Sequence, residues 1–305
     1  MQIPVVDLCR LNQSSAQRSL MLKDIAKACR KHGYFQVVNH GISQSVMKGA
    51  LEAASDFFAL SKEAKGQFAS DDIRRPVRYE TGTKDGKARS FLKHYAHPLS
   101  DWIHLWPAEP PSYREKMGMF AIEARKLALQ LMDAILESLG LGPAYLRKEL
   151  EEGMQMLAVN GYPQFSQPDV MVGLFPHSDY GFITILLQSC NGLEVMDHDD
   201  KCWRAVPHQP EALHVHIGDH LEVLSNGEFK TLIHRVVLNP DTRRISIASI
   251  HGLSIDEKVS TAKELLDGQQ PKRYEDSSFR DYLDYLHWKI KNQRSFIDSL
   301  KIGRA

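Results

Sequence analysis

Two polar pairs with a two-residue spacing lie in the central part of the chain: His177 with Asp179, and Arg244 with Ser246. On a β-strand, residues i and i+2 project from the same face, so each pair can direct two side chains to one point. An imidazole and a carboxylate, joined by a histidine from a distant strand, form the triad that leaves positions open on iron(II). His234 lies in an apolar run typical of a buried strand and is the candidate third ligand.

The second pair predicts an anion receptor. A guanidinium and a hydroxyl on one strand face can bind a carboxylate. The apolar neighbours Ile245 and Ile247 favour a buried strand, and a buried guanidinium requires a partner. The two pairs together therefore predict a metal beside a co-substrate that carries a carboxylate.

Other histidines offer alternatives to this metal site. A second His-x-Asp sequence, His198 to Asp200, lies in a polar cluster typical of a hairpin turn. His214 and His216 have the spacing of a zinc-binding pair on a strand, and a zinc protein built on them is a rival reading. We interpret these two histidines as core residues or as residues that support the metal ligands.

The surrounding motifs resemble those of the plant 2-oxoglutarate/iron(II)-dependent dioxygenases, which have the isopenicillin N synthase-like fold and include flavone synthase and flavanone hydroxylase. Residues 176–188 are similar to the family's first metal motif, and residues 217–227 followed by His234 are similar to its second half. Arg244-x-Ser246 resembles the oxoglutarate motif, and residues 160–163 resemble the Asn-Tyr-Tyr-Pro segment. Residues 3–8 and 33–41 also fit the opening of the family, so the resemblance spans nearly the whole chain.

The resemblance implies a role for each matching residue. Iron(II) would be held by His177, Asp179 and His234. The 2-oxoglutarate would be bound by a second set of side chains, namely Arg244, Ser246, Tyr162 and Asn160. Dioxygen would be the oxidant, with ascorbate as the reductant added in vitro.

The chain departs from the family pattern at three positions. Gly161 replaces the first tyrosine of the Asn-Tyr-Tyr-Pro segment, and His216 stands where an asparagine is usual. Ile250 replaces the phenylalanine of many flavonoid-acting relatives, and it shares a strand face with Arg244, so we expect it to line the substrate pocket. Three aromatic residues are further pocket candidates: Phe175, Tyr180 and Trp106.

The resemblance implies an oxygenase that hydroxylates or desaturates a small, largely apolar metabolite of plant type. A flavonoid or similar phenolic is favoured, because residues 101–111, with two tryptophans and several prolines, suit an apolar aromatic substrate. The alternatives are the same chemistry on a hormone, terpenoid or alkaloid, an oxidase that does not use oxoglutarate, and a non-enzymatic small-ligand binder on the same fold.

The elements that must position these residues change type along the chain. Helical spacing marks residues 15–31, 43–68 and 115–139, whereas 34–38, 91–98 and 102–106 read as extended and 71–88 as a charged loop. Short strands punctuated by Gly, Pro and Asn then run from 156 to about 252, before an amphipathic helix at 279–300. This order predicts a mainly β fold with flanking α: a distorted double-stranded β-helix (jelly roll) with N-terminal and C-terminal helices. We expect one compact catalytic unit, with residues 1–95 packed on a core of residues 96–305.

The amino-acid composition limits the kinds of molecule that the protein is expected to bind. The chain has 305 residues, 43% of them hydrophobic, and 38 Lys and Arg against 38 Asp and Glu. This balance, without a basic run rich in aromatics, argues against nucleic acid. No segment reaches the length of a membrane span, and the four cysteines form no Cys-x-x-Cys pair. We therefore expect a cytoplasmic monomer whose partner is a small-molecule substrate.

Overall fold

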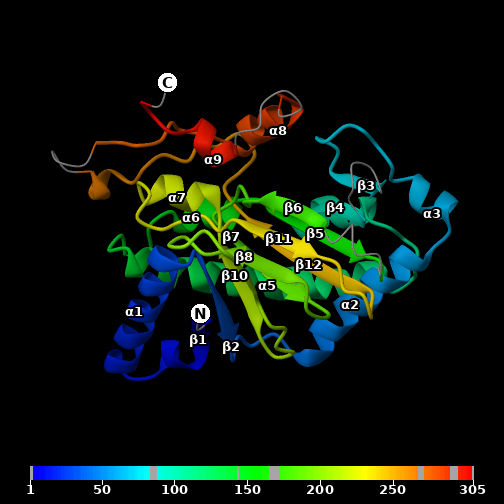
Figure 1. Cartoon of the computed structure of the whole chain (residues 1–305), viewed down its shortest axis with the longest axis horizontal. Coiled ribbons are helices and arrows are strands. Elements are labelled where there is room, and N and C mark those ends of the chain that lie inside the picture. The colour runs from blue at the N-terminus through cyan, green and yellow to red at the C-terminus, as the bar shows by residue number, and fades with distance from the viewer. Residues whose placement is uncertain are drawn as a thin grey trace.

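A computed structural model describes residues 3–82, 88–142, 144–164, 172–266, 271–288 and 295–303 of the chain (Figure 1). Within them the strands form an eight-stranded and a four-stranded sheet. The large sheet has the order β1-β2-β10-β7-β12-β5-β4-β3, and its strands are Val5–Asp7, Tyr34–Val38, Leu213–Ile217, Ile183–Gln188, Arg244–His251, Gln155–Tyr162, Arg89–His97 and Val77–Gly82. The small sheet has the order β6-β11-β8-β9, with strands Val172–His177, His234–Val237, Leu193–Met196 and Trp203–Ala205.

The two sheets form the expected jelly roll. The central strands of the large sheet, β7, β12 and β5, pair antiparallel with one another, as do β6, β11 and β8 in the small sheet. Alternation along β12 separates its two faces: Arg244 and Ser246 lie on one side of the sheet, and Ile245 and Ile247 on the other. Polar and charged side chains can therefore gather between the sheets while apolar ones face the helices.

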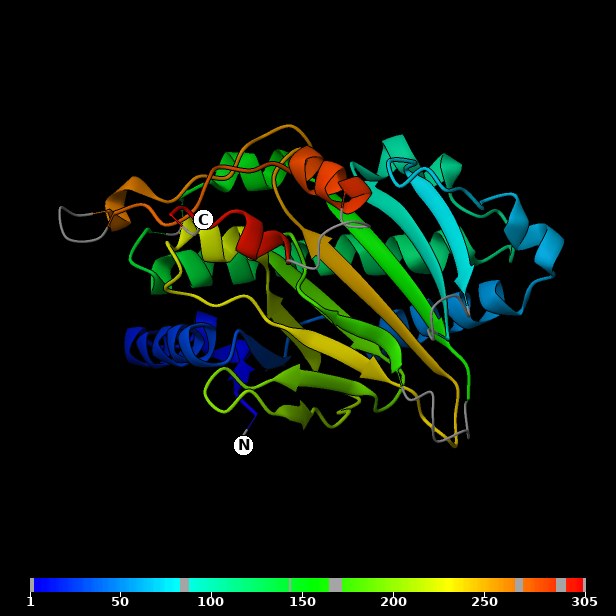
Figure 2. The ribbon, with the colours of Figure 1, turned by 45° about the horizontal axis from the view of Figure 1, so that its top comes forward.

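Helices cover the outer face of the large sheet. α2 (Gln44–Ala59) packs on β5 and β12, and α5 (Tyr113–Ser138) packs on β7 and β12 as well as on α1 (Ser15–Lys31) and α2. Figure 2 shows the long α5 running behind the strands. The main core lies between these helices and the sheet, where it buries a set of apolar side chains that includes Phe57, Phe120, Leu131, Leu157, Val159, Ile185 and Ile247.

Several predicted elements have different limits in the structure. The single helix expected at 43–68 is divided into α2 and α3 (Lys62–Gly66), because Ser61 accepts a hydrogen bond from the Ala64 amide and caps a new helix. Residues 102–106 are not extended, since α4 (Leu99–Trp102) and the 3-10 helix η3 (Ile103–Leu105) occupy this stretch. The loop expected at 71–88 contains strand β3.

The remaining helices lie near the ends of the strands. α6 (Arg147–Glu152) precedes β5, and α7 (Asp219–Leu224) follows β10. α8 (Phe279–Trp288) and α9 (Phe296–Ser299) lie side by side at one end of the strands, where the single helix expected at 279–300 was placed (Figures 1 and 2). Residues 289–294 between them lie outside the described residues.

The N-terminal region joins the large sheet instead of packing on it as a separate layer. β1 and β2 extend one edge through β10, and β3 and β4 extend the other edge through β5. The boundary expected between residues 95 and 96 falls inside β4.

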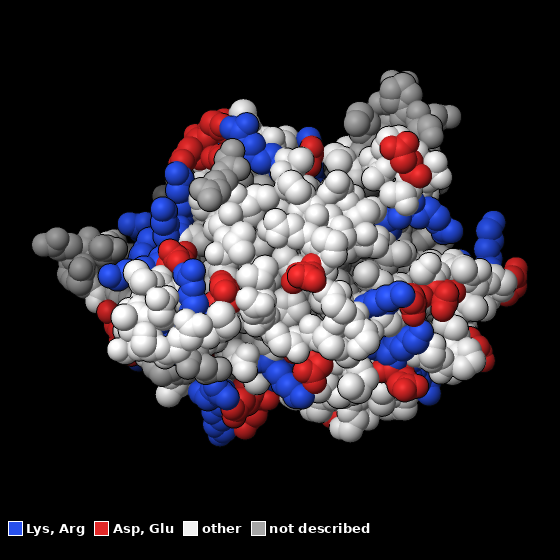
Figure 3. All heavy atoms as spheres, turned by 90° about the horizontal axis from the view of Figure 1, so that it is seen from below, with Lys and Arg blue, Asp and Glu red and all other residues white. Residues whose placement is uncertain are grey.

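One face of the molecule carries charges of both signs. Figure 3 shows Lys and Arg beside Asp and Glu near the rim of this face, around a central area that is mostly uncharged. Within the described part of the chain, no helix combines the length and hydrophobicity needed to cross a bilayer.

Candidate active site

Strand pairing brings the two predicted histidine ligands together. β6 and β11 run antiparallel, and their register places His177 directly opposite His234. The two ring centroids are 4.2 Å apart. Asp179 follows the end of β6, and the ligand atoms of His177, Asp179 and His234 all lie within 4.8 Å of one another. The pair expected on one strand is thus a strand-end histidine and a carboxylate in the loop that follows.

Backbone carbonyls fix the orientation of both imidazoles. The Nδ1–H of His177 donates to the carbonyl of Phe175 at 2.8 Å, and the Nδ1–H of His234 donates to the carbonyl of Leu232 at 3.3 Å. A carbonyl can only accept, so Nε2 of each ring keeps a free lone pair. This is the arrangement in which histidines bind a metal through Nε2.

The charge states of the three residues suit a cation. Burial lowers the pKa of His177 and of His234, so both rings are neutral near pH 7. Burial by itself would raise the pKa of Asp179, but the neighbouring His216, His234 and His177 together hold it well below its ordinary value. An ionised carboxylate and two neutral imidazoles are the donor set that a divalent metal requires.

A second buried carboxyl, Asp219, supports the loop that carries Asp179. Its side chain accepts hydrogen bonds from the Ser178 hydroxyl at 3.1 Å and the Thr231 hydroxyl at 2.8 Å. Its amide donates to the Asp179 carbonyl at 2.8 Å. Burial raises the pKa of Asp219 to about 8. The residue was visible in the sequence only as part of the family motif, because its supporting role depends on contacts with two distant segments.

The rival histidines occupy different places. His216 on β10 lines the cavity beside the three residues, with its Nδ1 3.8 Å from Asp179 Oδ2 and its ring centroid 4.7 Å from that of His234. His214 instead contacts Gln188, with 3.1 Å between the two Nε2 atoms. The His198 copy lies in the turn between β8 and β9, as its polar surroundings predict.

Arg244 lies buried at the start of β12 and is held by uncharged groups. It is 1% exposed, and its guanidinium donates to Gln188 Oε1 at 2.7 Å, Ser246 Oγ at 3.4 Å and the Cys190 carbonyl at 3.4 Å. The guanidinium carbon also lies 5.1 Å from the centroid of the Tyr162 ring. Among the described residues no carboxylate pairs with Arg244, so the structure contains a buried cation that can bind an anionic ligand.

The antiparallel register of β5 and β12 assembles the rest of the co-substrate site. Arg244 lies opposite Tyr162, Ser246 opposite Asn160, and Ile250 opposite Met156. These six side chains line a cavity of about 190 Å³ that also contains His177, Asp179 and His234, and we call it the inner cavity. The four predicted 2-oxoglutarate residues and the three predicted metal ligands therefore share one space.

Unpaired polar atoms in the inner cavity fit a polar occupant. Asn160 Oδ1, Thr184 Oγ1 and both ring nitrogens of His216 are buried without a hydrogen-bond partner in the protein. Such atoms are costly unless a ligand or water satisfies them. Together with the buried Arg244 and the three ligand atoms, they fit a metal ion with a carboxylate-bearing co-substrate.

The departure at Gly161 has a structural explanation. Gly161 faces away from the inner cavity, and a Cβ atom placed on it would lie 2.8 Å from the ring of Phe58 on α2. The space that a tyrosine side chain would need is thus occupied by Phe58. Tyr162 keeps its place opposite Arg244, so the departure does not loosen the co-substrate side of the strand.

Of the four substrate-pocket candidates, only Ile250 lines the inner cavity. Trp106 belongs to the N-terminal core: its indole N–H donates to the Tyr95 carbonyl at 2.8 Å, and its ring lies 4.1 Å from that of His94. Phe175, near the end of β6, is 41% exposed and does not line the inner cavity. The expectation for Trp106 was wrong, because its ring is buried in the core, whereas a substrate contact of Phe175 stays a prediction.

Tyr180 lies one layer behind the cavity wall, so this expectation also needs correction. Its ring stacks on Phe279 and on Tyr282 of α8, with centroid distances of 4.2 and 4.8 Å, and its hydroxyl contacts Met154 Sδ. Tyr282 is the residue of this stack that lines the inner cavity.

Two residues of β4, Arg89 and Phe91, also line the inner cavity and were not among the predicted site residues. They are two apart, on the strand that pairs with β5. The same alternation that singled out His177 and Arg244 would have placed them on one face. Nothing in the local sequence, however, indicated that β4 would pair beside the site.

Comparison with known proteins agrees with this geometry. The family model of the 2OG-Fe(II) oxygenase superfamily matches residues 153–252, and that of the non-haem dioxygenase in morphine synthesis N-terminal matches residues 3–109. From Oryza sativa subsp. japonica, 2-oxoglutarate-dependent dioxygenase 21, chloroplastic, is 59% identical, over 99% of this chain and 92% of the relative. Flavanone 3-dioxygenase 3, also from Oryza sativa subsp. japonica, is 56% identical, over 98% of this chain and 93% of the relative.

A solved structure gives the same answer for the fold. The crystal structure of JOX2 in complex with 2OG, Fe, and JA is 31% identical to this chain and superposes with a TM-score of 0.84, over 93% of this chain and 85% of that chain. The similarity in sequence and in structure thus extends over almost the full length. The chain belongs to the 2-oxoglutarate- and iron(II)-dependent dioxygenases, as the order of its motifs predicts.

Proposed function

We propose that His177, Asp179 and His234 hold the iron(II) of this dioxygenase, and that Arg244, Ser246, Tyr162 and Asn160 hold its 2-oxoglutarate. The observation that carries the proposal is the inner cavity itself. It joins three ligand atoms within 4.8 Å of one another to a buried arginine, Arg244, that no carboxylate among the described residues neutralises. A dicarboxylate that reaches from the metal to Arg244 would satisfy both.

The bound metal supplies oxygen activation coupled to oxidative decarboxylation of 2-oxoglutarate. The residues of this chain supply binding and orientation. The carbonyls of Phe175 and Leu232 keep the Nε2 lone pairs of the two histidines directed at the metal. Gln188 and Ser246 hold the Arg244 guanidinium in place, so its planar donors are preorganised for a carboxylate.

For the substrate we infer a small, largely apolar molecule of the flavonoid or similar phenolic class, which is hydroxylated or desaturated. The lining of the inner cavity includes apolar side chains, among them Met156, Leu174, Ile250 and Tyr282. A relative at 56% identity is named flavanone 3-dioxygenase 3, which supports this class for the present chain.

The experiment that tests this function measures substrate-dependent turnover. The purified protein, supplied with iron(II), ascorbate and 2-oxoglutarate, is incubated with a panel of flavonoids, hormones, terpenoids and alkaloids. Succinate release and product mass are recorded. We expect a gain of one oxygen, or loss of two hydrogens, in a flavonoid or simpler phenolic. Turnover confined to a hormone, terpenoid or alkaloid would contradict the substrate class but not the reaction.

Two further expectations belong to this proposal. We expect a cytoplasmic location, and imaging of the tagged chain in plant cells checks it. A chloroplast location is the alternative outcome, because one relative is named as chloroplastic. A monomeric state is checked by analytical ultracentrifugation across a range of protein concentrations.

A further inference from the structure

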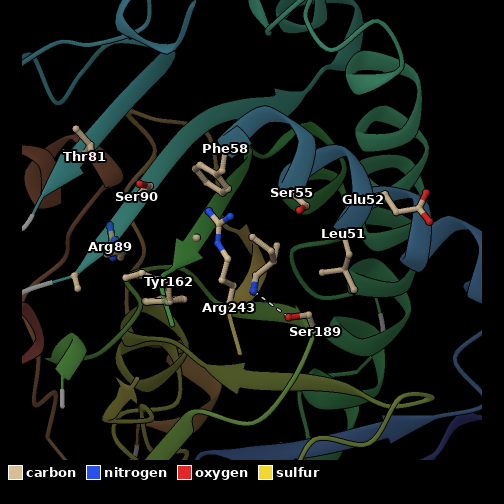
Figure 4. Close-up of a pocket in the computed structure, with 14 residues that line it drawn as sticks. Leu51, Glu52, Ser55, Phe58, Thr81, Arg89, Ser90, Tyr162, Ser189 and Arg243 are labelled. Atoms are coloured by element: carbon tan, nitrogen blue, oxygen red, sulfur yellow. Dashed lines mark hydrogen bonds between the residues drawn. The ribbon is translucent and has the colours of Figure 1, made fainter. Parts of the chain in front are cut away.

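Arg89 begins β4 at a point where two cavities meet. Besides the inner cavity, it lines a cavity of about 550 Å³ between α2 and the ends of β4, β5 and β12, which we call the outer cavity. Tyr162 also lines both. Figure 4 shows Arg89 close to Tyr162 at one side of the outer cavity, whereas Arg243 reaches into its centre. Arg89 and Arg244 lie on the two strands that flank β5, so Tyr162 has an arginine on each side.

The guanidinium of Arg89 has no acidic partner among the described residues. Its guanidinium instead lies over an aromatic ring, with the guanidinium carbon 4.4 Å from the centroid of Phe91. Glu80, whose charge acts on Arg89, is already paired with Arg78 at 3.1 Å. Arg235, which is also half-buried, is by contrast paired with Glu194 at 2.6 Å. Burial lowers the pKa of Arg89, which reflects the poor solvation of its charge.

An unpaired, poorly solvated guanidinium at a cavity wall favours an anionic ligand. The planar group presents several donors in a fixed geometry that matches a carboxylate or another anionic oxygen. The 2-oxoglutarate carboxylate has its own receptor in Arg244, which Gln188 and Ser246 hold on the far side of Tyr162. An anion bound to Arg89 would therefore belong to another molecule in the site, and the candidate is the substrate.

We propose that the substrate is an aromatic molecule that presents an anionic oxygen, a carboxylate or an ionised phenol, to Arg89, with its ring packed against Phe91. This inference rests on the proposed function and narrows it. Phe91 is two residues from Arg89 and lines the inner cavity with it, so one substrate can contact both side chains. The charged contact would set the orientation in which the substrate faces the metal.

The test compares pairs of small aromatic probes, in which one member is anionic and the other is its neutral methylated form. The probes are cinnamate with methyl cinnamate, and naringenin with its 7-methyl ether, so that carboxylate and phenol are examined separately. Binding to the wild-type protein with 2-oxoglutarate is measured by calorimetry at pH 8, followed by succinate release with iron(II). We expect the ionised member of at least one pair to bind about 10- to 100-fold more tightly than its methylated partner. The pair that shows the difference identifies the source of the anion.

Variants of Arg89 test whether this residue causes the tighter binding of the ionised probe. Arg89→Gln should remove the difference within the pair, and Arg89→Lys should restore part of it, while 2-oxoglutarate binding stays unchanged. Arg78→Gln is the control, because Arg78 also lies over the Phe91 ring, at 5.9 Å, but is paired with Glu80 and lines neither cavity. It should keep the preference. Melting temperatures verify that each variant is folded.

Two results would overturn the proposal. One is equal binding of both members of each pair, or binding of none of the four probes, by a wild-type protein that still converts 2-oxoglutarate. The other is weaker binding of 2-oxoglutarate in Arg89→Gln, which would make Arg89 part of the co-substrate site. A wild-type protein that neither binds nor converts 2-oxoglutarate would instead be a failure of the proposed function, so the two are distinguishable.

Discussion

The Nδ1 atom of His216 lies 3.8 Å from Oδ2 of Asp179, while the Nε2 atom of His177 lies 3.9 Å from the other oxygen of the same carboxylate. His216 therefore lies nearest the oxygen that is not directed at His177. We expect a residue in this place to orient a metal ligand without binding the metal. We predict that His216→Ala lowers iron affinity about 10-fold and retains one iron per chain, because losses of this size are typical when a supporting partner is removed.

Bound iron, measured over a series of free iron concentrations, checks this prediction. His214→Ala is the matched control, since His214 is on the same strand and contacts Gln188 instead. Complete loss of iron in His216→Ala would make His216 a ligand. A protein purified without added iron that holds zinc, and loses it in both variants, would favour the zinc pair.

The three proposed ligands give a sharper expectation. His177→Ala, Asp179→Ala and His234→Ala should each abolish 2-oxoglutarate turnover and stoichiometric iron binding, because one of three protein ligands is lost. His198→Ala is the control, as it removes the histidine of the other His-x-Asp sequence, which lies in the β8–β9 turn. Turnover at the wild-type rate in His177→Ala or His234→Ala would mean that the metal is held elsewhere.

The positions that the sequence predicted well share one property: their side chains alternate along a strand. The spacing of Arg244, Ser246 and Ile250 determines which sheet face they occupy, so one register places all three in the inner cavity. Aromatic character carries no such information. Trp106 and Tyr180 are aromatic and could line a pocket, yet both side chains are buried in the core. Their position depends on tertiary contacts that the local sequence does not specify.

Long-range pairing explains the other differences. Arg89 reaches the site because β4 pairs with β5, a contact between segments about 70 residues apart that no local pattern specifies. The end of α2 is a different case. In the structure Ser61 accepts a hydrogen bond from the Ala64 amide and starts a new helix, a contact that the apolar spacing does not reveal. Periodicity alone therefore favoured one long helix.

The co-substrate assignment predicts a specific kinetic effect. Arg244→Ala should raise the KM for 2-oxoglutarate by an amount equivalent to about 2–5 kcal/mol, since truncating one partner of a buried charged pair costs this much. Arg244→Lys should recover only part, because an ammonium lacks the planar donors. The KM and the calorimetric affinity for 2-oxoglutarate check this. The control is Arg243→Ala, because Arg243 is the neighbouring arginine and lines the outer cavity but not the inner one. Unchanged affinity in both Arg244 variants would contradict the assignment.

Stability in acid should depend on His94, which is remote from the metal ligands. Its ring is fully buried, Nε2 contacts the Tyr113 hydroxyl at 2.9 Å, and burial lowers the pKa of His94 to about 3. In the unfolded chain His94 has an ordinary pKa near 6.5, so between pH 6.5 and 3 the unfolded chain binds a proton that the folded chain does not bind. The stability from neutral His94 is therefore present above pH 6.5 and is lost as the pH falls from 6.5 toward 3.

We predict that His94→Gln makes the free energy of unfolding less dependent on pH in this window, by about 1.4 kcal/mol per pH unit. Urea unfolding of both proteins at pH 5, 6 and 7 measures the two slopes. His104→Gln is the control, because His104 is exposed. Identical slopes for wild type and His94→Gln would show that His94 takes up a proton in the folded state.

The shape of the substrate pocket should depend on Ile250. This residue lines the inner cavity, lies opposite Met156 on β5 and Thr184 on β7, and is 6% exposed. Because it lies two positions beyond Ala248 on the face of Arg244 and Ser246, we expect it to face the substrate and not the carboxylate of 2-oxoglutarate. Ile250→Ala should weaken substrate binding through lost dispersion contacts, and Ile250→Phe should add a ring worth about 0.5–1.5 kcal/mol to a flat aromatic substrate.

The measurement is substrate affinity and product distribution, set beside the KM for 2-oxoglutarate, in both variants. Ile247→Ala is the matched control: it is on the same strand but faces the helices, where truncation should lower stability by about 2–5 kcal/mol and leave substrate affinity alone. If Ile250→Ala and Ile250→Phe lose stability equally while substrate kinetics do not change, Ile250 acts only as a core residue. Opposite effects of the two variants on one aromatic substrate would instead identify Ile250 as the wall on which the ring rests.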